Sequence, residues 1–444
     1  MVNFKLKYVF LPLSAILLIV NCNEDKIKTN TIAISAIMDS IQASTTTASA
    51  TVNPTGGENV CDGKTFTGSP LTVSGDITGN TTWSNAIKLS GTVTVKNNST
   101  LTIQPGTVVF GETGSSLFIT QGSKIEAVGT ALLPICFTSA KNVGFRAPGD
   151  WGGLVIIGNA RGTRSSTTEG IIPLPYGSGT NDSESSGTLK YVIVEFAGNE
   201  VSPGDELNGV SSYTIGSGTS FDFVQVHRGL DDGFEFWGGA PVGKHLLVTG
   251  GMDDDFDFDE GFRGTLQYLI GVKYPVSCGG TPSSDPHGME MDGMHSGVSN
   301  CTTGPGCSNP SVSNYVLIGQ QVAGSRAQRH REGMQGTFSE GLSYNFVTGI
   351  TCENSGNGGT TGSVFNKILS DKALTNGASC TGTVTNSITK LPITSLGAID
   401  STNCGNGTSK PDFNIISEYS SGAAGPVDSS NPNWWADWTV YRSK

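Results

Sequence analysis

The sequence predicts an all-β protein, a right-handed parallel β-helix (a solenoid) with long insertions at some turns. Short runs of strand-forming residues recur through the chain, each bounded by Gly, Asn, Asp or Pro. Helical patterns are almost absent beyond residue 60. An internal repeat then favours the β-helix over a sandwich or a barrel, because its period is the length of one β-helix coil.

The repeat is clearest around two acidic segments. GLDDGFEFWGG begins at Gly229 and GMDDDFDFDEG begins at Gly251, so the offset is 22 residues. The same offset aligns DFVQV at Asp222 with KHLLV at Lys244, and that run with LQYLI at Leu266. Each coil is therefore expected to contain two or three short strands that stack on the equivalent strands of its neighbours.

The chain begins like an exported protein. Two lysines precede an apolar run at 10–20 that is too short to cross a bilayer, so 1–21 is predicted to be a signal peptide. The segment LIVNC, which ends at Cys22, resembles a bacterial lipobox, in which the cysteine is acylated and becomes the mature N-terminus. Asn21 departs from the small residue usual before that cysteine, and ordinary secretion with cleavage elsewhere is the alternative.

Composition divides the remaining chain into two parts. Residues 22–60 are rich in Ser, Thr and Ala and are predicted to be a flexible tether. Residues 61–444 are predicted to be the β-helix body, with a Cys-rich insertion near 276–310 and a Trp-rich C-terminal end. The formal net charge of −12 argues against binding to nucleic acid, and it leaves divalent cations, basic partners and neutral glycans open.

The cysteine count also suits an exported lipoprotein. There are nine cysteines, an odd number. Reserving Cys22 for a lipid such as palmitate leaves eight, enough for four disulfides whose pairing the sequence leaves open. These eight are Cys61, Cys136, Cys278, Cys301, Cys307, Cys352, Cys380 and Cys404. The absence of a C-x-x-C pair and the presence of only five histidines argue against a zinc site.

Acidic residues are predicted to line the outside of neighbouring coils. Phenylalanine and aspartate alternate through 255–259, so the rings should fill the interior and the carboxylates should face solvent. The same alternation recurs around Glu235 and Glu290, which predicts a ladder of Glu235, Asp257 and Glu290 on coils about 4.8 Å apart. Ten carboxylates are the candidate metal ligands: Asp231, Asp232, Glu235, Asp253, Asp254, Asp255, Asp257, Asp259, Glu290 and Asp292.

Three interpretations of this cluster remain open: a solvated structural face, a structural Ca²⁺ site and a catalytic site. Stacked like charges cost about 1 kcal/mol each in water and about 3 kcal/mol at an effective dielectric near 20. Ca²⁺ suits flexible all-oxygen sites better than Mg²⁺ or a transition metal does. Neither an EF-hand nor a glycine-rich calcium nonapeptide occurs in the sequence.

The catalytic interpretation is a Ca²⁺-dependent polysaccharide lyase or a glycoside hydrolase. Several such lyases are β-helices with acidic metal ligands and an arginine base. The arginines that could supply the base are Arg263, Arg326, Arg329 and Arg331. Trp237 or Tyr268 could stack on sugar rings, whereas RAQRHREG at 326–333 is expected to be a solvated basic turn. Asp231-Asp232 with His295 faintly resembles polygalacturonases, and His227 and His245 are expected to be structural.

Six motifs occur together in one order: LTIQPGTVVFG, GSKIEAVGTALLPICFTS, PGDWGGLVIIGNA, GTLKYVIVEFAG, LDDGFEFWGG and NPNWWADWTVYR. As a set they resemble a family of exported β-helix lipoproteins of spirochaetes and Bacteroidetes-type bacteria, mostly without assigned function. The likeness is good over about residues 70–275. It implies the fold and a location in the cell envelope, and it implies no reaction.

The function expected from the sequence is that of a non-enzymatic outer-membrane lipoprotein with no catalytic residues. The lipid on Cys22 would anchor it to the membrane, in a leaflet that the sequence leaves open. The β-helix would serve adhesion, binding of a glycan or an extracellular protein, or envelope structure, with Ca²⁺ as a structural cofactor. The polysaccharide-cleaving enzyme is the alternative.

Overall fold

The computed structural model describes residues 60–62, 64, 66, 68–294, 306–356, 358–388, 399, 404–405, 411, 413 and 425–443. Contacts divide the chain into Met1–Asn53 and Pro54–Lys444, and the described residues all belong to the second unit. The predicted signal peptide, Cys22 and the predicted tether up to residue 59 lie outside the described residues and stay predictions. Within the described residues, no helix has the length and apolarity needed to cross a membrane.

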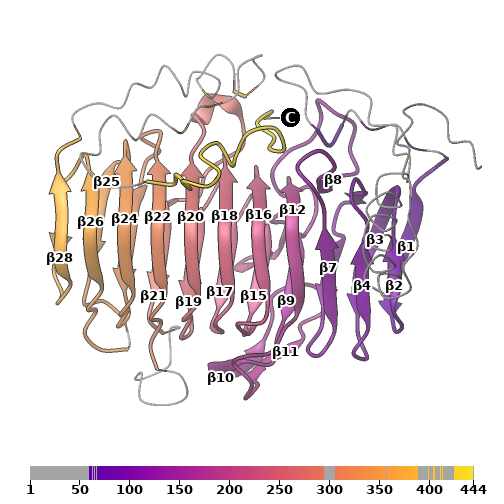
Figure 1. Cartoon of the computed structure of the whole chain (residues 1–444), viewed down its shortest axis with the longest axis horizontal. Coiled ribbons are helices and arrows are strands. Elements are labelled where there is room, and N and C mark those ends of the chain that lie inside the picture. Colours follow the sequence, from indigo (N-terminus) through magenta and orange to yellow (C-terminus); the bar gives the residue numbers. More distant parts are fainter. Residues whose placement is uncertain are drawn as a thin grey trace, which may run out of the picture. The chain divides into compact units, whose positions relative to one another are not determined.

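The body is a parallel β-helix, as the sequence predicts (Figure 1). A 24-stranded sheet bends into three faces, here called A, B and C, and successive coils pair in parallel. The handedness of the coil stays a prediction. Face A contains β6 (Ser116–Ile119), β9 (Leu154–Ile157), β15 (Val210–Tyr213), β17 (Phe234–Trp237), β19 (Phe256–Asp259), β21 (Met289–Asp292), β23 (Arg326–Arg331), β25 (Thr348–Cys352) and β27 (Thr375–Asn376).

In the later coils, one long bent strand supplies both face B and face C. These strands are β12 (Gly187–Glu195), β16 (Ser220–His227), β18 (Val242–Thr249), β20 (Thr265–Val272), β22 (Ser311–Ile318), β24 (Thr337–Tyr344), β26 (Val364–Ser370) and β28 (Thr381–Asn386). In the first coils face B is built by β2 (Thr81–Trp83), β4 (Thr100–Ile103) and β7 (Lys124–Val128), and face C by β5 (Val108–Gly111) and β8 (Ile135–Ser139). Strands β1 (Leu71–Ile77) and β3 (Ala86–Val95) bend from face C into face A.

The bends of β12, β16, β18 and β20 each place one residue in the left-handed region. Tyr191, Phe223, His245 and Tyr268 have φ of 49°, 58°, 53° and 61°. Their rings stack from coil to coil, with centroid distances of 4.4, 4.2 and 5.0 Å. A left-handed residue turns the chain through a corner without ending the strand, so one continuous run serves two faces.

The repeat holds for two coils and then gains a residue. Phe234 pairs with Phe256 at the predicted offset of 22. Lys244 pairs with Gln267, however, and the predicted pairing of Lys244 with Leu266 is wrong by one residue. The turn from β19 to β20 is longer by one residue than the turn from β17 to β18, and a one-residue shift exchanges the inner and outer side chains of a strand.

Insertions and the C-terminal segment cover parts of the coil. An antiparallel hairpin of β10 (Arg161–Thr167) and β11 (Pro175–Ser178) follows β9, and β13 (Glu200–Ser202) with β14 (Asp205–Glu206) follows β12. Tyr176 and Leu207 from these insertions pack on Tyr213 and Trp237 of face A. The predicted Cys-rich insertion near 276–310 contains the 3-10 helix η2 (Val276–Cys278) and also strand β21 of the coil itself.

The described C-terminal segment, 425–443, lies across face C, where it is drawn in yellow over β16 to β20 (Figure 1). Gln225 exchanges hydrogen bonds of 2.7 and 2.8 Å with the backbone of Val440. Disulfides join Cys61 to Cys136, Cys278 to Cys404 and Cys352 to Cys380, and Cys307 is also disulfide-bonded. Cys301 lies outside the described residues. The predicted use of disulfides is therefore confirmed.

Candidate functional site

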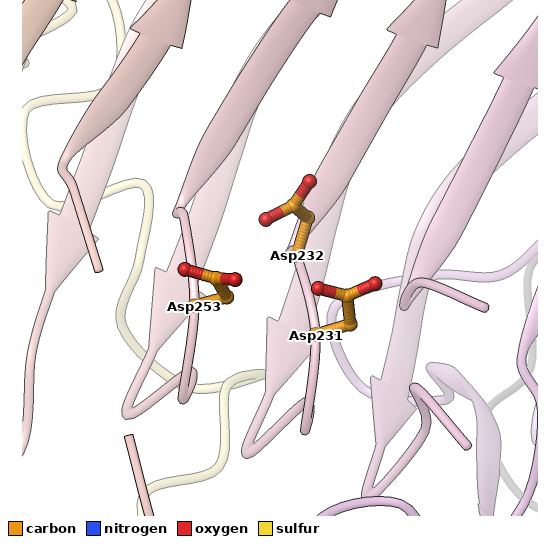
Figure 2. A group of neighbouring side chains, drawn as sticks. All are labelled: Asp231, Asp232 and Asp253. Carbon is orange, nitrogen blue, oxygen red and sulfur yellow. The ribbon is translucent and has the colours of Figure 1, made fainter. Parts of the chain in front are cut away.

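Two consecutive turns carry the first group of carboxylates. Asp231 and Asp232 precede β17 on one coil, and Asp253 precedes β19 on the next (Figure 2). Each of the three offers an oxygen within 4.8 Å of the other two. The turns therefore bring together acids from two coils that are 22 residues apart in the sequence.

The ladder on face A supplies two more groups. Glu235 pairs with Asp257, and Asp257 with Glu290, while Phe256 and Phe258 are fully buried in the interior. Oxygens of Asp232, Glu235 and Asp257 lie within 4.8 Å of one another, as do those of Asp254, Asp257 and Glu290. Asp232 belongs to two of the three groups and so does Asp257, so the acids form one connected row.

A column of side chains accepts a hydrogen bond from each successive turn. The Asp232 amide donates to Asn208 Oδ1 at 3.1 Å, and the Asp254 amide donates to Asp232 Oδ1 at 2.9 Å. The His287 amide donates to Asp254 Oδ1, and the Arg326 amide donates to His287 Nδ1 at 3.2 Å. Each aspartate thus uses one oxygen to hold the next coil and keeps the other available for a ligand.

The acidic cluster is buried or half-buried throughout, so it is not a freely solvated face; Asp231, Asp253, Asp257 and Glu290 are half-buried. Asp232, Glu235 and Asp254 are only 6%, 7% and 5% exposed. Asn208 Nδ2 donates to Glu235, and Ser283 Oγ donates to Asp253 Oδ1 at 2.5 Å. Two insertions approach the acids, since the charges of Glu206 and Glu169 both raise the pKa of Asp231. Periodicity shows which way a side chain points and not which other segments lie beside it.

Burial raises the pKa of the central carboxyls well above its usual range, and neighbouring carboxylates raise it further. The groups affected are Asp231, Asp232, Glu235, Asp254 and Asp257. Asp257 Oδ1 is buried and has no hydrogen-bond partner among the described residues. Such a cluster needs bound protons or a bound cation. The donors are all oxygens, so the residues present fit a hard divalent cation.

Arginines neutralise the far end of the ladder. Arg329 Nη1 lies 3.0 Å from Glu290 Oε1, and Arg331 contacts both Glu290 at 2.9 Å and Asp292 at 2.6 Å. Burial acts against ionisation, but the hydrogen bond from His287 and the charge of Arg331 hold the pKa of Glu290 at about 2. Burial raises the pKa of Asp292 to about 8 despite Arg331.

His287 is placed as a donor rather than as a metal ligand. Because Nδ1 accepts the Arg326 amide, the neutral ring carries its proton on Nε2, which faces Glu290 Oε1 at 3.5 Å. Nδ1 is thus occupied by the Arg326 amide and has no lone pair left for a cation.

Three predicted ligands lie outside the metal-sized groups formed by the described residues. Asp255 is fully buried and pairs with Lys273 at 3.0 Å, so its predicted outward orientation is wrong. Burial raises the pKa of Asp255 to about 6. Asp259 Oδ1 accepts the Glu260 amide at 2.5 Å, and Asp292 is held by Arg331.

Of the four predicted arginines, two lie beside the acidic ladder and two pair with other acids. The segment 326–333, predicted to be a basic turn, contains strand β23, which brings Arg329 and Arg331 beside the ladder. Arg263 instead pairs with Asp182 at 2.5 Å, and Arg326 lies 3.5 Å from Glu353. His295 lies outside the described residues.

Neither predicted aromatic residue is an open sugar platform. Trp237 is 9% exposed and stacks on Tyr213 beneath the insertions. Tyr268 stacks on His245 at the bend between faces B and C, away from the ladder. His227 is buried between Thr249 Oγ1 and the Arg442 carbonyl, and burial lowers its pKa to about 3, so its expected structural role agrees with its contacts.

Sequence reasoning missed Asn208, His287 and Glu169. A signal existed for the first, because Asn208-Gly209 precedes β15 just as Asp232-Gly233 precedes β17. The insertion after β20 hides His287 from a 22-residue alignment. Glu169 follows β10, and the sequence has no pattern that would place it beside Glu235, whose pKa its charge helps to raise.

Comparison with known proteins places this architecture. Residues 75–439 match a protein family described as "Pectate-lyase like beta helix domain". None of the curated proteins matches the chain. Among solved structures, the crystal structure of pectate lyase Pel9A is similar at 12% sequence identity with a TM-score of 0.41, covering 84% of this chain and 86% of that one.

The family match corrects one conclusion of the sequence analysis. The protein was expected not to be an enzyme, and the match contradicts this, because the family is described by its likeness to a lyase. The resemblance to exported lipoproteins concerns location and stays a prediction. With most of its length matched, the chain belongs to the family of pectate-lyase-like β-helix domains.

Proposed function

We propose that this protein binds and cleaves an acidic polysaccharide on face A, in a Ca²⁺-dependent reaction of the lyase type. One observation carries the proposal: a row of buried and half-buried carboxylates, with the buried and unpartnered Asp257 Oδ1 at its centre, ends in two arginines on the next coil. Family membership supports the reaction class. The proposal concerns the same face that the sequence singled out as acidic.

The carboxylates would hold the cation. Asp232 and Asp257 each belong to two of the groups, and Asp232 and Asp254 each keep one oxygen free of the backbone ladder. Ca²⁺ accepts six to eight oxygen ligands in flexible geometry, which suits side chains from three coils. When bound, Ca²⁺ would neutralise a substrate carboxylate and repel the proton on the neighbouring guanidinium.

Arg329 and Arg331 would contact the sugar chain. Glu290 and Asp292 keep Arg331 charged, which suits it to pair with a substrate carboxylate. Arg329 follows Glu290 in the same register and is our candidate for the base. In the elimination, the base takes the C5 proton of a uronate, the C4–O bond breaks as a C4–C5 double bond forms, and the departing oxygen takes a proton from water.

The test is to incubate the purified protein with a panel of polyuronates, with Ca²⁺ or with EGTA, and to follow the ultraviolet absorbance of unsaturated product. We expect product from at least one polyuronate, only with Ca²⁺. Asp232→Asn should abolish it while preserving the fold, because Asn208 shows that an asparagine can fill this column position. Arg329→Ala should abolish turnover and leave Ca²⁺ affinity within about twofold.

Asp76→Asn is the matched control, since that carboxylate lies on the first coil in an exposed pair with Lys96. It should leave both Ca²⁺ binding and product formation unchanged. Absence of product from every polyuronate, together with normal Ca²⁺ binding, would refute the lyase and leave only the cation site. Absence of Ca²⁺ binding by calorimetry would refute both.

We also propose that the protein is held at the cell envelope through a lipid on Cys22. The support is the lipobox-like LIVNC at the end of an apolar run. Metabolic labelling with palmitate should mark the natural protein and not a Cys22→Ser variant. Equal labelling of both would contradict the proposal.

A further inference from the structure

Lys273 and Asp255 form an ion pair that no part of the proposed reaction uses. Their side chains are 2% and 0% exposed, and Lys273 Nζ lies 3.0 Å from Asp255 Oδ1. Nζ also donates to the Asp253 carbonyl. Asp255 Oδ2 is buried and has no hydrogen-bond partner among the described residues. Both charged groups are therefore removed from water. Lys273 Nζ and Asp255 Oδ1 have hydrogen-bond partners, whereas Asp255 Oδ2 has none among the described residues.

The carboxyl group of Asp255 occupies a position in the hydrophobic interior. Along β16, β18 and β20, the register aligns Val226, Val248 and Gly271. A Cβ on Gly271 would stand 2.5 Å from Asp255 Oδ2 and 3.0 Å from Leu317. The missing side chain at Gly271 therefore creates the space that the carboxyl group fills, and the surroundings of that space are apolar.

We propose that Lys273 and Asp255 condense to an intramolecular isopeptide bond. Nζ attacks Cγ of Asp255, the C–O bond breaks, and the oxygen leaves as water with two of the three ammonium protons. An ammonium and a carboxylate thus give one amide and one water, with no other reactant and no net gain or loss of protons. The product closes the coil that runs from Asp255 through β19 and β20 to Lys273.

The surroundings favour the amide over the ion pair. Two charges buried away from water carry a large desolvation penalty, and removing both eliminates it. The remaining N–H already faces the Asp253 carbonyl, so it keeps a partner. A neutral amide oxygen without a partner is also less costly to bury than a carboxylate oxygen.

Peptide mapping of the natural protein tests this. After denaturation, reduction and alkylation, trypsin should release residues 245–263 joined to a second peptide that begins at Gly264 and continues past Lys273. The mass of the product should be lower than the sum of the two peptides by one water. Cleavage after Lys273 should be lost, because trypsin does not cut at an acylated lysine.

Three comparisons make the result decisive. Asp255→Asn should give a branched peptide of the same mass as the natural one, because ammonia then leaves instead of water. Lys273→Arg should give no branch. Lys141, which is 49% exposed and 2.6 Å from Asp150, is the internal control and should be cleaved normally. A free peptide Gly264–Lys273 from the natural protein, with no branched product, would overturn the proposal.

Discussion

At the scale of single residues, two aspartates of the acidic row each use one carboxylate oxygen for a structural hydrogen bond and leave the other oxygen for a ligand. Asp232 and Asp254 each accept a backbone amide from the next coil through one oxygen, as Asn208 does before them. This hydrogen bond is structural and needs no charge, since the Asn208 amide oxygen makes it equally well. The charge of the aspartates is therefore in excess of what the fold requires, which points to a ligand.

The pH dependence of stability should reveal this excess. Because the folded protein raises the pKa of carboxyls such as Asp257 and Asp292, it binds more protons than the unfolded chain does. Its stability should then fall as pH rises from the ordinary carboxyl range to about 8, the pKa of Asp292. Glu290, with its pKa at about 2, contributes the opposite trend only below that range.

Melting temperatures measured in EGTA across this pH range provide the test. Saturating Ca²⁺ should abolish the decline, because the cation binds the ionised carboxylates and stabilises the folded state. A melting temperature that stays flat or rises with pH in EGTA would contradict the raised pKa values.

At the scale of elements, the left-handed corner residues allow one strand to serve two faces. The conformation costs an ordinary side chain roughly 1–2 kcal/mol, so each corner needs compensation. Phe223 obtains it by stacking between Tyr191 and His245. Lys367, at φ 55° in a later coil, is 67% exposed and pairs with Glu340 at 3.0 Å.

Substitutions at two corners should therefore have opposite effects. Phe223→Ala removes a buried ring and should lower the free energy of unfolding by about 3 kcal/mol. Lys367→Gly relieves the strained backbone and loses little, so it should raise that free energy by up to about 1 kcal/mol. Urea denaturation measures both, and a destabilising Lys367→Gly would show that the corner is not strained.

At the scale of the whole molecule, a disulfide and an ion pair link chain segments that are far apart in sequence. The disulfide of Cys278 and Cys404 spans 126 residues, and Asp62, among the first described residues, pairs with Arg442, among the last. A solenoid has contacts mainly between neighbouring coils, so long-range links of this kind limit how independently its parts can unfold.

Removing the disulfide that closes the longest described loop should accordingly cost more than removing one that closes a shorter loop. By loop-closure entropy, replacing Cys278 and Cys404 by serine should cost about 5 kcal/mol, against about 4 kcal/mol for Cys352 and Cys380. The latter pair is separated by only 28 residues. Denaturant titration of the two double variants measures the difference, and a larger loss for the shorter loop would contradict this account.

Local patterns in the sequence were enough to predict the architecture and most of the candidate site. Local alternation showed that Phe256 and Phe258 face inward, and the 22-residue offset placed Glu235 beside Asp257, because both follow from strand geometry and parallel stacking. Both rules act between near neighbours, so they can be read from the chain. A fixed offset no longer predicts the pairing after an insertion. One extra turn residue was enough to displace Leu266 from its predicted partner.

Long-range packing, which local patterns do not reveal, set the surroundings of the individual acids. It turned Asp255 into the interior toward Lys273 and brought Arg329 and Arg331 to the end of the ladder. It also placed two insertions against face A and raised the pKa values of the acids there. These outcomes rest on the space left at Gly271 and on segments that close over face A, and such long-range packing has no period in the sequence.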